Sequence, residues 1–104
     1  MINEFNKCSF HDQILIDIRR ENYDVIIVAK NEEETEFEIV VKNAKIETNA
    51  DFDILDMKGS YIIGMSYHES DDGIKYIHLE TVSRHIPFTD EVYFYSKEII
   101  ILKK

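Results

Sequence analysis

Apolar and polar residues alternate along most of this 104-residue chain, and this pattern restricts its fold more than any other feature. Successive side chains of a β-strand point to opposite faces, so the alternation predicts strands with one buried face. The β-branched and aromatic residues, together with a single proline, favour the same structure. We therefore expect one all-β domain over residues 1–104, with about seven antiparallel strands in a sandwich or a partly open barrel.

The N-terminal half predicts a three-strand antiparallel meander. In DQILIDIRR the alternation puts Ile14, Ile16 and Ile18 on one face. DVIIVAK is almost continuously apolar, which is typical of a central strand covered on both faces. FEIVVK alternates again and supplies the third strand.

A hairpin is predicted over SYIIGMSYHESDDGIKYIHLETVS. The first arm has one apolar face, formed by Tyr61, Ile63, Met65 and Tyr67. A three-residue loop that ends at Gly73 pairs Tyr67 with Ile77, and it pairs Met65 with Leu79. Facing partners then share a side of the sheet, whereas a two-residue turn would separate the apolar sets. Gly73 takes the left-handed position that favours glycine.

Two other segments are less regular. TNADFDILDMKG places Thr48 and Asp51 at the spacing of a capping box, so we expect a short helix near residues 49–57, or else an acidic loop. VYFYSKEIIILKK predicts one long strand or two short ones. Isoleucine or leucine occupies both faces of its last part, so we expect that part to pair inside the sheet with both faces covered.

The charge of the chain restricts its partners. Twelve basic residues against 21 acidic ones give a net charge of −9, which repels phosphate backbones and anionic lipids. We expect no nucleic-acid or membrane partner, and a basic protein as the partner if there is one. The chain shows one cysteine, no signal-peptide pattern and no apolar run of membrane-spanning length, so we expect a cytoplasmic location.

The stretch CSFHDQ holds the side chains of a hydrolytic site. In an extended segment, however, Cys8 and His11 point to opposite faces. We therefore interpret His11 and Asp12 as polar anchors at the start of the first strand, with His11 capping a carbonyl and Asp12 accepting backbone N–H bonds. A small enzyme that uses Cys8 and His11 is the alternative.

Two histidines offer a possible metal site. The hairpin register places His68 and His78 on one outer face, diagonally on adjacent strands, where Glu69 or Glu80 could complete a zinc shell. A solvated pair is the favoured reading, and we expect no metal and no cofactor. Glycine-rich phosphate loops and a G-x-S-x-G elbow are absent from the sequence. A small-ligand-binding barrel is a further alternative.

Tyrosines are the best candidates for a protein interface. Tyr76, Tyr93 and Tyr95 fall in strand segments at positions that face away from the core. Tyrosine buries a large area at an interface and loses little conformational freedom there. Cross-strand packing within the fold is the alternative role.

The N-terminal half also shows a resemblance. Phe10-His11-Asp12 precedes the ILIDIRRENYDVIIVAK hairpin and the FEIVV-x-NAKI strand. Over residues 8–48 this order resembles a group of small bacterial β-proteins with an FHD or WHD start, some of them immunity proteins of polymorphic-toxin systems. The resemblance implies a non-enzymatic protein that binds and blocks a partner, and it assigns no binding residue.

Overall fold

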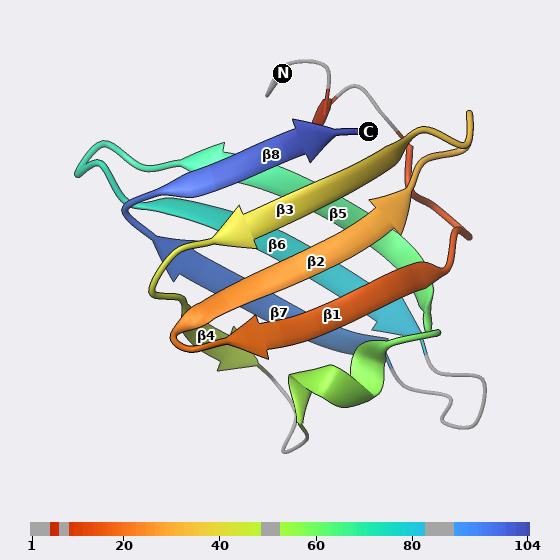
Figure 1. The fold of residues 1–104 in the computed structure, drawn as a ribbon, viewed down its shortest axis with the longest axis horizontal. Coiled ribbons are helices and arrows are strands. Elements are labelled where there is room, and N and C mark those ends of the chain that lie inside the picture. Colours follow the sequence, from red (N-terminus) through yellow and green to blue (C-terminus); the bar gives the residue numbers. More distant parts are fainter. Residues whose placement is uncertain (1–4, 7–8, 49–52, 83–88) are drawn as a thin grey trace.

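Two four-stranded antiparallel sheets pack face to face and form a β-sandwich (Figure 1). The structure is a computed structural model that describes residues 5–6, 9–48, 53–82 and 89–104. The predicted all-β class and the sandwich are confirmed. The sheets are not closed into a barrel, and the described residues form eight strands, one more than expected.

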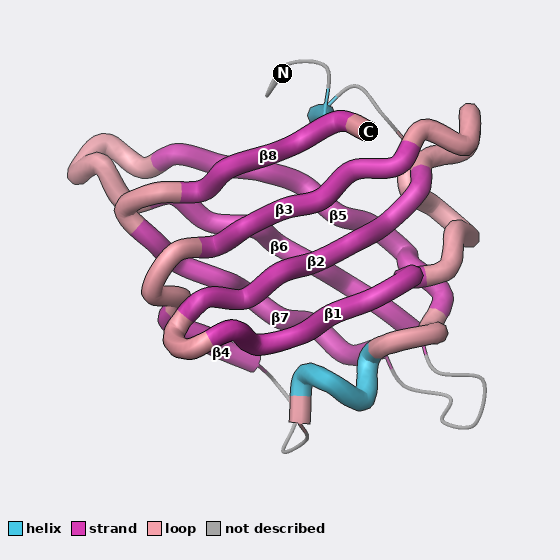
Figure 2. The backbone as a smooth tube through the Cα atoms, viewed as in Figure 1, coloured by secondary structure: helices cyan, strands magenta, loops and turns pink. Residues whose placement is uncertain are grey.

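Each sheet combines a three-strand meander with one strand from the other half of the chain (Figure 2). The first sheet has the order β1-β2-β3-β8, with bounds Leu15–Glu21, Asp24–Lys30, Glu36–Val41 and Ile99–Lys103. The second sheet has the order β4-β7-β6-β5, with bounds Lys45–Thr48, Thr89–Ser96, Lys75–Val82 and Tyr61–Glu69. β4 pairs with β7 and β8 pairs with β3, so each half of the chain contributes one strand to the sheet of the other half.

The core lies between the inner faces of the two sheets. Phe37 and Ile39 of β3 and Ile77 and Phe94 of the second sheet are fully buried in one cluster. Phe37 also meets two aromatic residues from the N-terminal segment, Phe5 and Phe10, with ring centroids 5.3–5.9 Å apart within the trio. Phe10 of the FHD triplet is therefore a core residue.

The predicted hairpin register is confirmed. Tyr67 pairs with Ile77, and Met65 pairs with Leu79. The loop closes where the Ser70 N–H donates to the Ile74 carbonyl over 2.8 Å. Gly73 has a φ of +85°, as the left-handed position requires.

Two β-bulges change the faces that simple alternation assigns. The register shifts between Leu15 and Asp17, so Leu15 and Ile18 point into the core. Ile14 and Ile16 are 42% and 36% exposed, so the prediction that they share a buried face with Ile18 is wrong.

The second bulge lies in β5, between Ile62 and Gly64. Ile62 is buried there, and Tyr61 and Ile63 are only half-buried. The predicted apolar face of this arm therefore begins at Met65. A single extra residue reverses the alternation on one side of the bulge.

The predicted helix is one turn of 3-10 helix, η1, at Ile54–Met57. Its cap is Asp53, whose Oδ1 accepts the Leu55 N–H over 3.0 Å. The cap predicted at Thr48 is wrong, because Thr48 ends β4. Residues 49–52 of the predicted segment, including Asp51, lie outside the described part of the chain.

The C-terminal segment forms two strands that belong to different sheets. β7 lies inside the second sheet, and β8 lies at the edge of the first. Ile100 and Leu102 are 39% and 45% exposed, so the prediction that both faces of the last strand are covered is wrong. An edge strand has a neighbour on one side only, and its outer face is correspondingly less covered.

Candidate functional site

Five rings form two rows on the outer face of the second sheet. The strand register sets His68, Tyr76 and Tyr95 side by side across β5, β6 and β7. In the next row His78 of β6 lies beside Tyr93 of β7. We call these five residues the aromatic face.

The sequence folds this way because β6 and β7 alternate without interruption. Ile77 and Leu79 fill the core at 0% exposure, so Tyr76 and His78 between them must point outward. Phe94 is likewise buried and turns its two neighbours on β7 outward. The three predicted interface tyrosines are thereby brought together.

The rings of the aromatic face pack against one another. His68 stacks on Tyr76 with centroids 4.8 Å apart, and His78 stacks on Tyr93 at 4.5 Å with an angle of 4° between the planes. Tyr76 lies 5.3 Å from Tyr95, and Tyr93 lies 6.1 Å from Tyr95. Such contacts hold the rings upright on the sheet and reduce their freedom before any partner binds.

Glu91 joins the two rings of the second row. Its Oε1 lies 2.7 Å from His78 Nε2 and accepts the Tyr93 hydroxyl over 3.0 Å. The Tyr93 bond first, and His78 second, lower the pKa of Glu91 below its ordinary value. The same carboxylate raises the pKa of the Tyr93 hydroxyl. The site therefore holds a fixed negative charge beside a neutral phenol.

Charged side chains lie around the aromatic face. Glu47 of β4 faces Tyr93, and Glu80 of β6 faces Glu91, so carboxylates surround the second row. Beyond the first row lies a pocket of about 880 Å³, whose lining includes Lys45, Lys97, Tyr76 and Tyr95. The same lining includes the carboxylates of Glu47, Asp72 and Glu98, so the pocket holds charges of both signs, whereas the second row offers ring faces and carboxylates to a cation.

The two histidines of a possible zinc site have no third ligand among the described residues. His68 and His78 lie diagonally on adjacent strands, as the register predicts. Glu69 instead accepts the Tyr67 hydroxyl over 2.6 Å, and His68 Nε2 lies 2.8 Å from Ser66 Oγ. Within the described ranges, no group of three or more His, Cys, Asp or Glu residues is arranged to hold a metal ion.

Sequence reasoning missed Glu91 as the partner of His78. The available signal was its position on β7, two residues before Tyr93 and so on the same face. That position identifies Glu91 only when the β6–β7 register is known, and the sequence offers no tight turn that would fix this register. The connection between these strands, residues 83–88, lies outside the described part of the chain.

His11 and Asp12 lie at the free edge of β5. His11 Nδ1 is 3.1 Å from the Ile63 carbonyl oxygen, and the Asp12 N–H donates to the Ile62 carbonyl over 2.8 Å. Asp12 has a left-handed φ of +65°, and its carboxylate lies 3.5 Å from His11 Nε2. Cys8, the proposed nucleophile of the alternative enzyme, lies outside the described residues.

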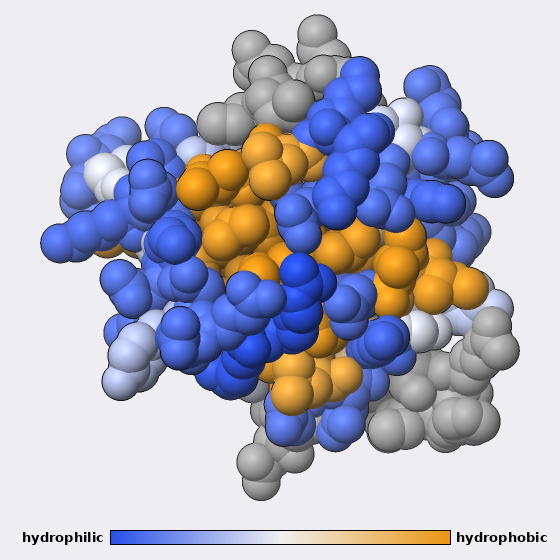
Figure 3. All heavy atoms as spheres, viewed as in Figure 1, coloured by the Kyte–Doolittle hydropathy of each residue, from blue (hydrophilic) through white to orange (hydrophobic). Residues whose placement is uncertain are grey.

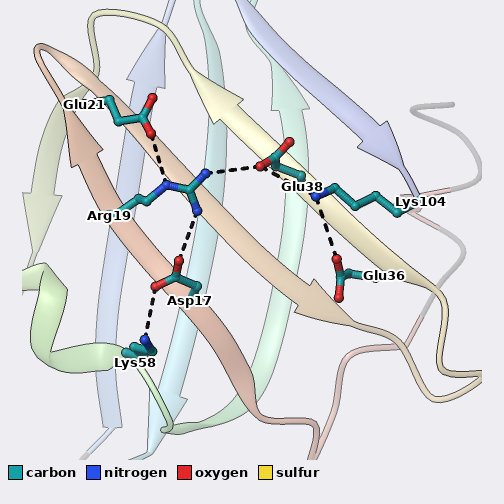
Figure 4. Close-up of polar contacts among 7 residues, drawn as sticks. All are labelled: Asp17, Arg19, Glu21, Glu36, Glu38, Lys58 and Lys104. Atoms are coloured by element: carbon teal, nitrogen blue, oxygen red, sulfur yellow. Dashed lines mark hydrogen bonds and ion pairs between the residues drawn. The ribbon is translucent and has the colours of Figure 1, made fainter.

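The outer face of the first sheet is different in character (Figure 4). Arg19 makes ion pairs with Asp17, Glu21 and Glu38 at 3.0–3.3 Å. Apolar side chains show between these charged groups (Figure 3). Ile26 and Val28 of β2 are only 6% and 7% exposed under this layer, which confirms that β2 is covered on both faces.

Comparisons with known proteins do not assign a function. None of the helices in the described part of the chain is long and apolar enough to cross a membrane. No protein-family model, no curated protein and no solved structure matches the chain.

Proposed function

We propose that this protein is a non-enzymatic binding module whose aromatic face covers a basic site on a partner protein. The observation that supports the proposal is the set of two ring rows on an open sheet face. Blocking a partner by covering it is also the role implied by the resemblance of residues 8–48 to immunity proteins.

The aromatic face has the composition of an interface rather than that of an ordinary solvated sheet. Tyr76, Tyr93 and Tyr95 are half-buried by one another, so each still offers ring area to a partner. Tyrosine is enriched at interfaces and in their binding hot spots. Rings already held by mutual stacking lose little further freedom on binding.

A basic partner suits both the rings and the surrounding charge. An arginine or lysine of the partner can lie over a tyrosine ring and pair with Glu47 or Glu80. The net charge of −9 attracts such a partner over a longer range and raises the association rate. Binding by this route weakens as salt screens the charges.

The test is affinity capture from the native cell lysate, with the wild type and two variants immobilised in parallel. Tyr93→Ala removes the tyrosine of the second row and its stacking partner for His78. Tyr23→Ala is the matched control, because Tyr23 is 80% exposed in the β1–β2 turn, which joins two strands of the other sheet. We expect the wild type and Tyr23→Ala to capture one basic protein at about 0.05 M salt, and to capture much less of it at about 0.5 M.

Loss of that protein from the Tyr93→Ala column supports the proposal, provided that the variant melts at the temperature of the wild type. Equal capture by all three columns would show that the partner uses another surface. Capture of a non-basic protein that resists high salt would contradict the electrostatic part of the mechanism.

A further inference from the structure

Four rows of side chains cross the outer face of the first sheet. The residues between them on β2, β3 and β8 point into the core, so alternation turns the row residues outward. The two central rows are mostly apolar and hold Ile26, Val40 and Ile100, and then Val28, Glu38 and Leu102. The two end rows are charged and hold Asp24, Lys42 and Glu98 at one end, and Lys30, Glu36 and Lys104 at the other.

The two end rows are complementary in charge. Each of the three strands has a carboxylate at one end and a lysine at the other, in the pairs Asp24 and Lys30, Glu36 and Lys42, and Glu98 and Lys104. Because neighbouring strands are antiparallel, the signs alternate along each end row. One end row therefore reads minus, plus, minus, and the other reads plus, minus, plus.

Apolar surface is exposed between the end rows. Ile100 and Leu102 are 39% and 45% exposed, and Val40 is half-buried. Apolar atoms show across this face in the space-filling view (Figure 3). Cations on the same face hold several of its carboxylates, as in the Asp24–Lys42 pair at 2.9 Å. A second chain with a charge of −9 is therefore repelled less here than beside carboxylates that lack such cations.

We propose that this face binds a second copy of the chain, sheet against sheet, with a two-fold axis that runs across the strands between the two central rows. The contact is isologous, because the same residues serve both copies. Each strand then crosses its own copy in the antiparallel direction, with the mean strand directions within about 30° of each other, as in aligned sheets. The aromatic face lies on the other sheet, so this inference does not depend on the proposed function.

The end rows meet with opposite charges on all three strands. Asp24 meets Lys30 of the second copy, Lys42 meets Glu36, and Glu98 meets Lys104. In the centre, Ile100 meets Leu102 of the second copy and covers exposed apolar area. Val40 meets Glu38, whose carboxylate keeps its own partners Arg19 at 3.3 Å and Lys104 at 4.0 Å. A carboxylate that stays paired in this way can be covered at a smaller cost than an isolated one.

The side chains of β1 select this direction of the axis. Across the strands, Arg19 meets Asp17 of the second copy. An axis along the strands would instead set β1 against β8 of the second copy. Glu21 would then meet Glu98, and Asp17 would meet Leu102. Like charges and a carboxylate on an apolar side chain both oppose association.

Sedimentation velocity tests the contact, in about 0.15 M salt to screen the net charge of the two copies. We expect the wild type to shift from monomer to dimer between about 1 µM and 1 mM protein. Leu102→Lys puts a charge on the apolar centre at an exposed site and should remain monomeric. His68→Lys is the matched control, since it adds the same side chain at an exposed site of the second sheet, and it should dimerise as the wild type does.

A mixing experiment tests the direction of the axis. Glu98→Lys and Lys104→Glu should each weaken the dimer of their own kind, because like charges then meet at both end rows. An equal mixture of the two variants should restore it, since opposite charges meet again at both places. With the axis along the strands, Glu98→Lys would instead strengthen its own dimer through Glu21.

Three results would overturn the proposal. The first is a wild type that stays monomeric at about 1 mM. The second is a dimer that Leu102→Lys leaves intact. The third is a mixture of the two charge variants that associates no better than either variant alone.

Discussion

At the scale of single residues, Glu91 connects the chemistry of the aromatic face. One of its oxygens serves both His78 and Tyr93, so the carboxylate positions two stacked rings at once. A bond between an ionised carboxylate and a neutral donor is stronger than one between neutral groups. Glu91 therefore orders the second row and keeps a negative charge beside it.

The lowered pKa of Glu91 predicts a specific change in acid stability. A carboxyl whose pKa is lower in the folded state stabilises the fold above its ordinary pKa of 4.5, and that stabilisation is lost as the pH falls through the lowered pKa. Glu91→Gln removes this group from the titration. We expect the free energy of unfolding, measured by urea denaturation, to fall less between about pH 5 and pH 3 in this variant than in the wild type.

A suitable control is Glu80→Gln, which removes the facing carboxylate on β6 and leaves both Glu91 contacts in place. This control should keep the acid dependence that Glu91 gives to the wild type. The same acid slope in Glu91→Gln and the wild type would show that the Glu91 contacts do not stabilise the fold.

At the scale of elements, the hairpin of β5 and β6 shows what sequence can determine. The loop length followed from the requirement that facing residues share a side, and Tyr67–Ile77 is the observed pair. The same reasoning failed at Ile14 and Ile63, because bulges break the alternation there. Nothing local in the sequence marks an extra residue whose position depends on tertiary packing.

Gly73 gives a direct test of the hairpin turn. At a φ of +85° an added Cβ is strained, although no atom lies within 4 Å of its position. We expect Gly73→Ala to lower the free energy of unfolding by about 1–2 kcal/mol, through backbone strain alone. Gly64→Ala is the matched control, since that site is equally open but has no left-handed φ. Equal effects of the two substitutions would contradict the turn assignment.

β8 tests how the two halves of the chain depend on each other. Removal of residues 98–104 takes away the buried Ile101 and the whole ladder on β3, and it leaves the core open beside Ile39. We expect the truncated chain to lack a cooperative thermal transition by circular dichroism, whereas deletion of Lys104 alone should preserve one. A truncated protein that melts cooperatively would show that β8 is dispensable.

For the aromatic face, the sequence predicted where the tyrosines point but not how their rings pack. Alternation alone placed Tyr76, Tyr93 and Tyr95 on an outer face, because Ile77 and Phe94 had to be inside. It did not show that the rings stack, since that depends on the order β7-β6-β5. Glu91 was missed as the partner of His78 for the same reason.

At the scale of the whole molecule, the two outer faces distribute the charge differently. On the first sheet, Arg19 is surrounded by carboxylates and Lys104 lies 3.9 Å from Glu36, so these carboxylates are already paired with cations of the chain (Figure 4). On the second sheet, Glu47 faces Tyr93 and Glu80 faces Glu91, so carboxylates lie beside the aromatic face. This arrangement supports the proposal of a basic partner for the second sheet.

The proposed binding surface is tested by the affinity of the captured basic protein for three versions of this chain, measured by calorimetry. We expect Tyr93→Ala to raise Kd at least about tenfold, which corresponds to about 1.4 kcal/mol. Tyr23→Ala should leave Kd unchanged. Equal Kd values for Tyr93→Ala and the wild type, with both proteins folded, would contradict the claim that the aromatic face is the binding surface.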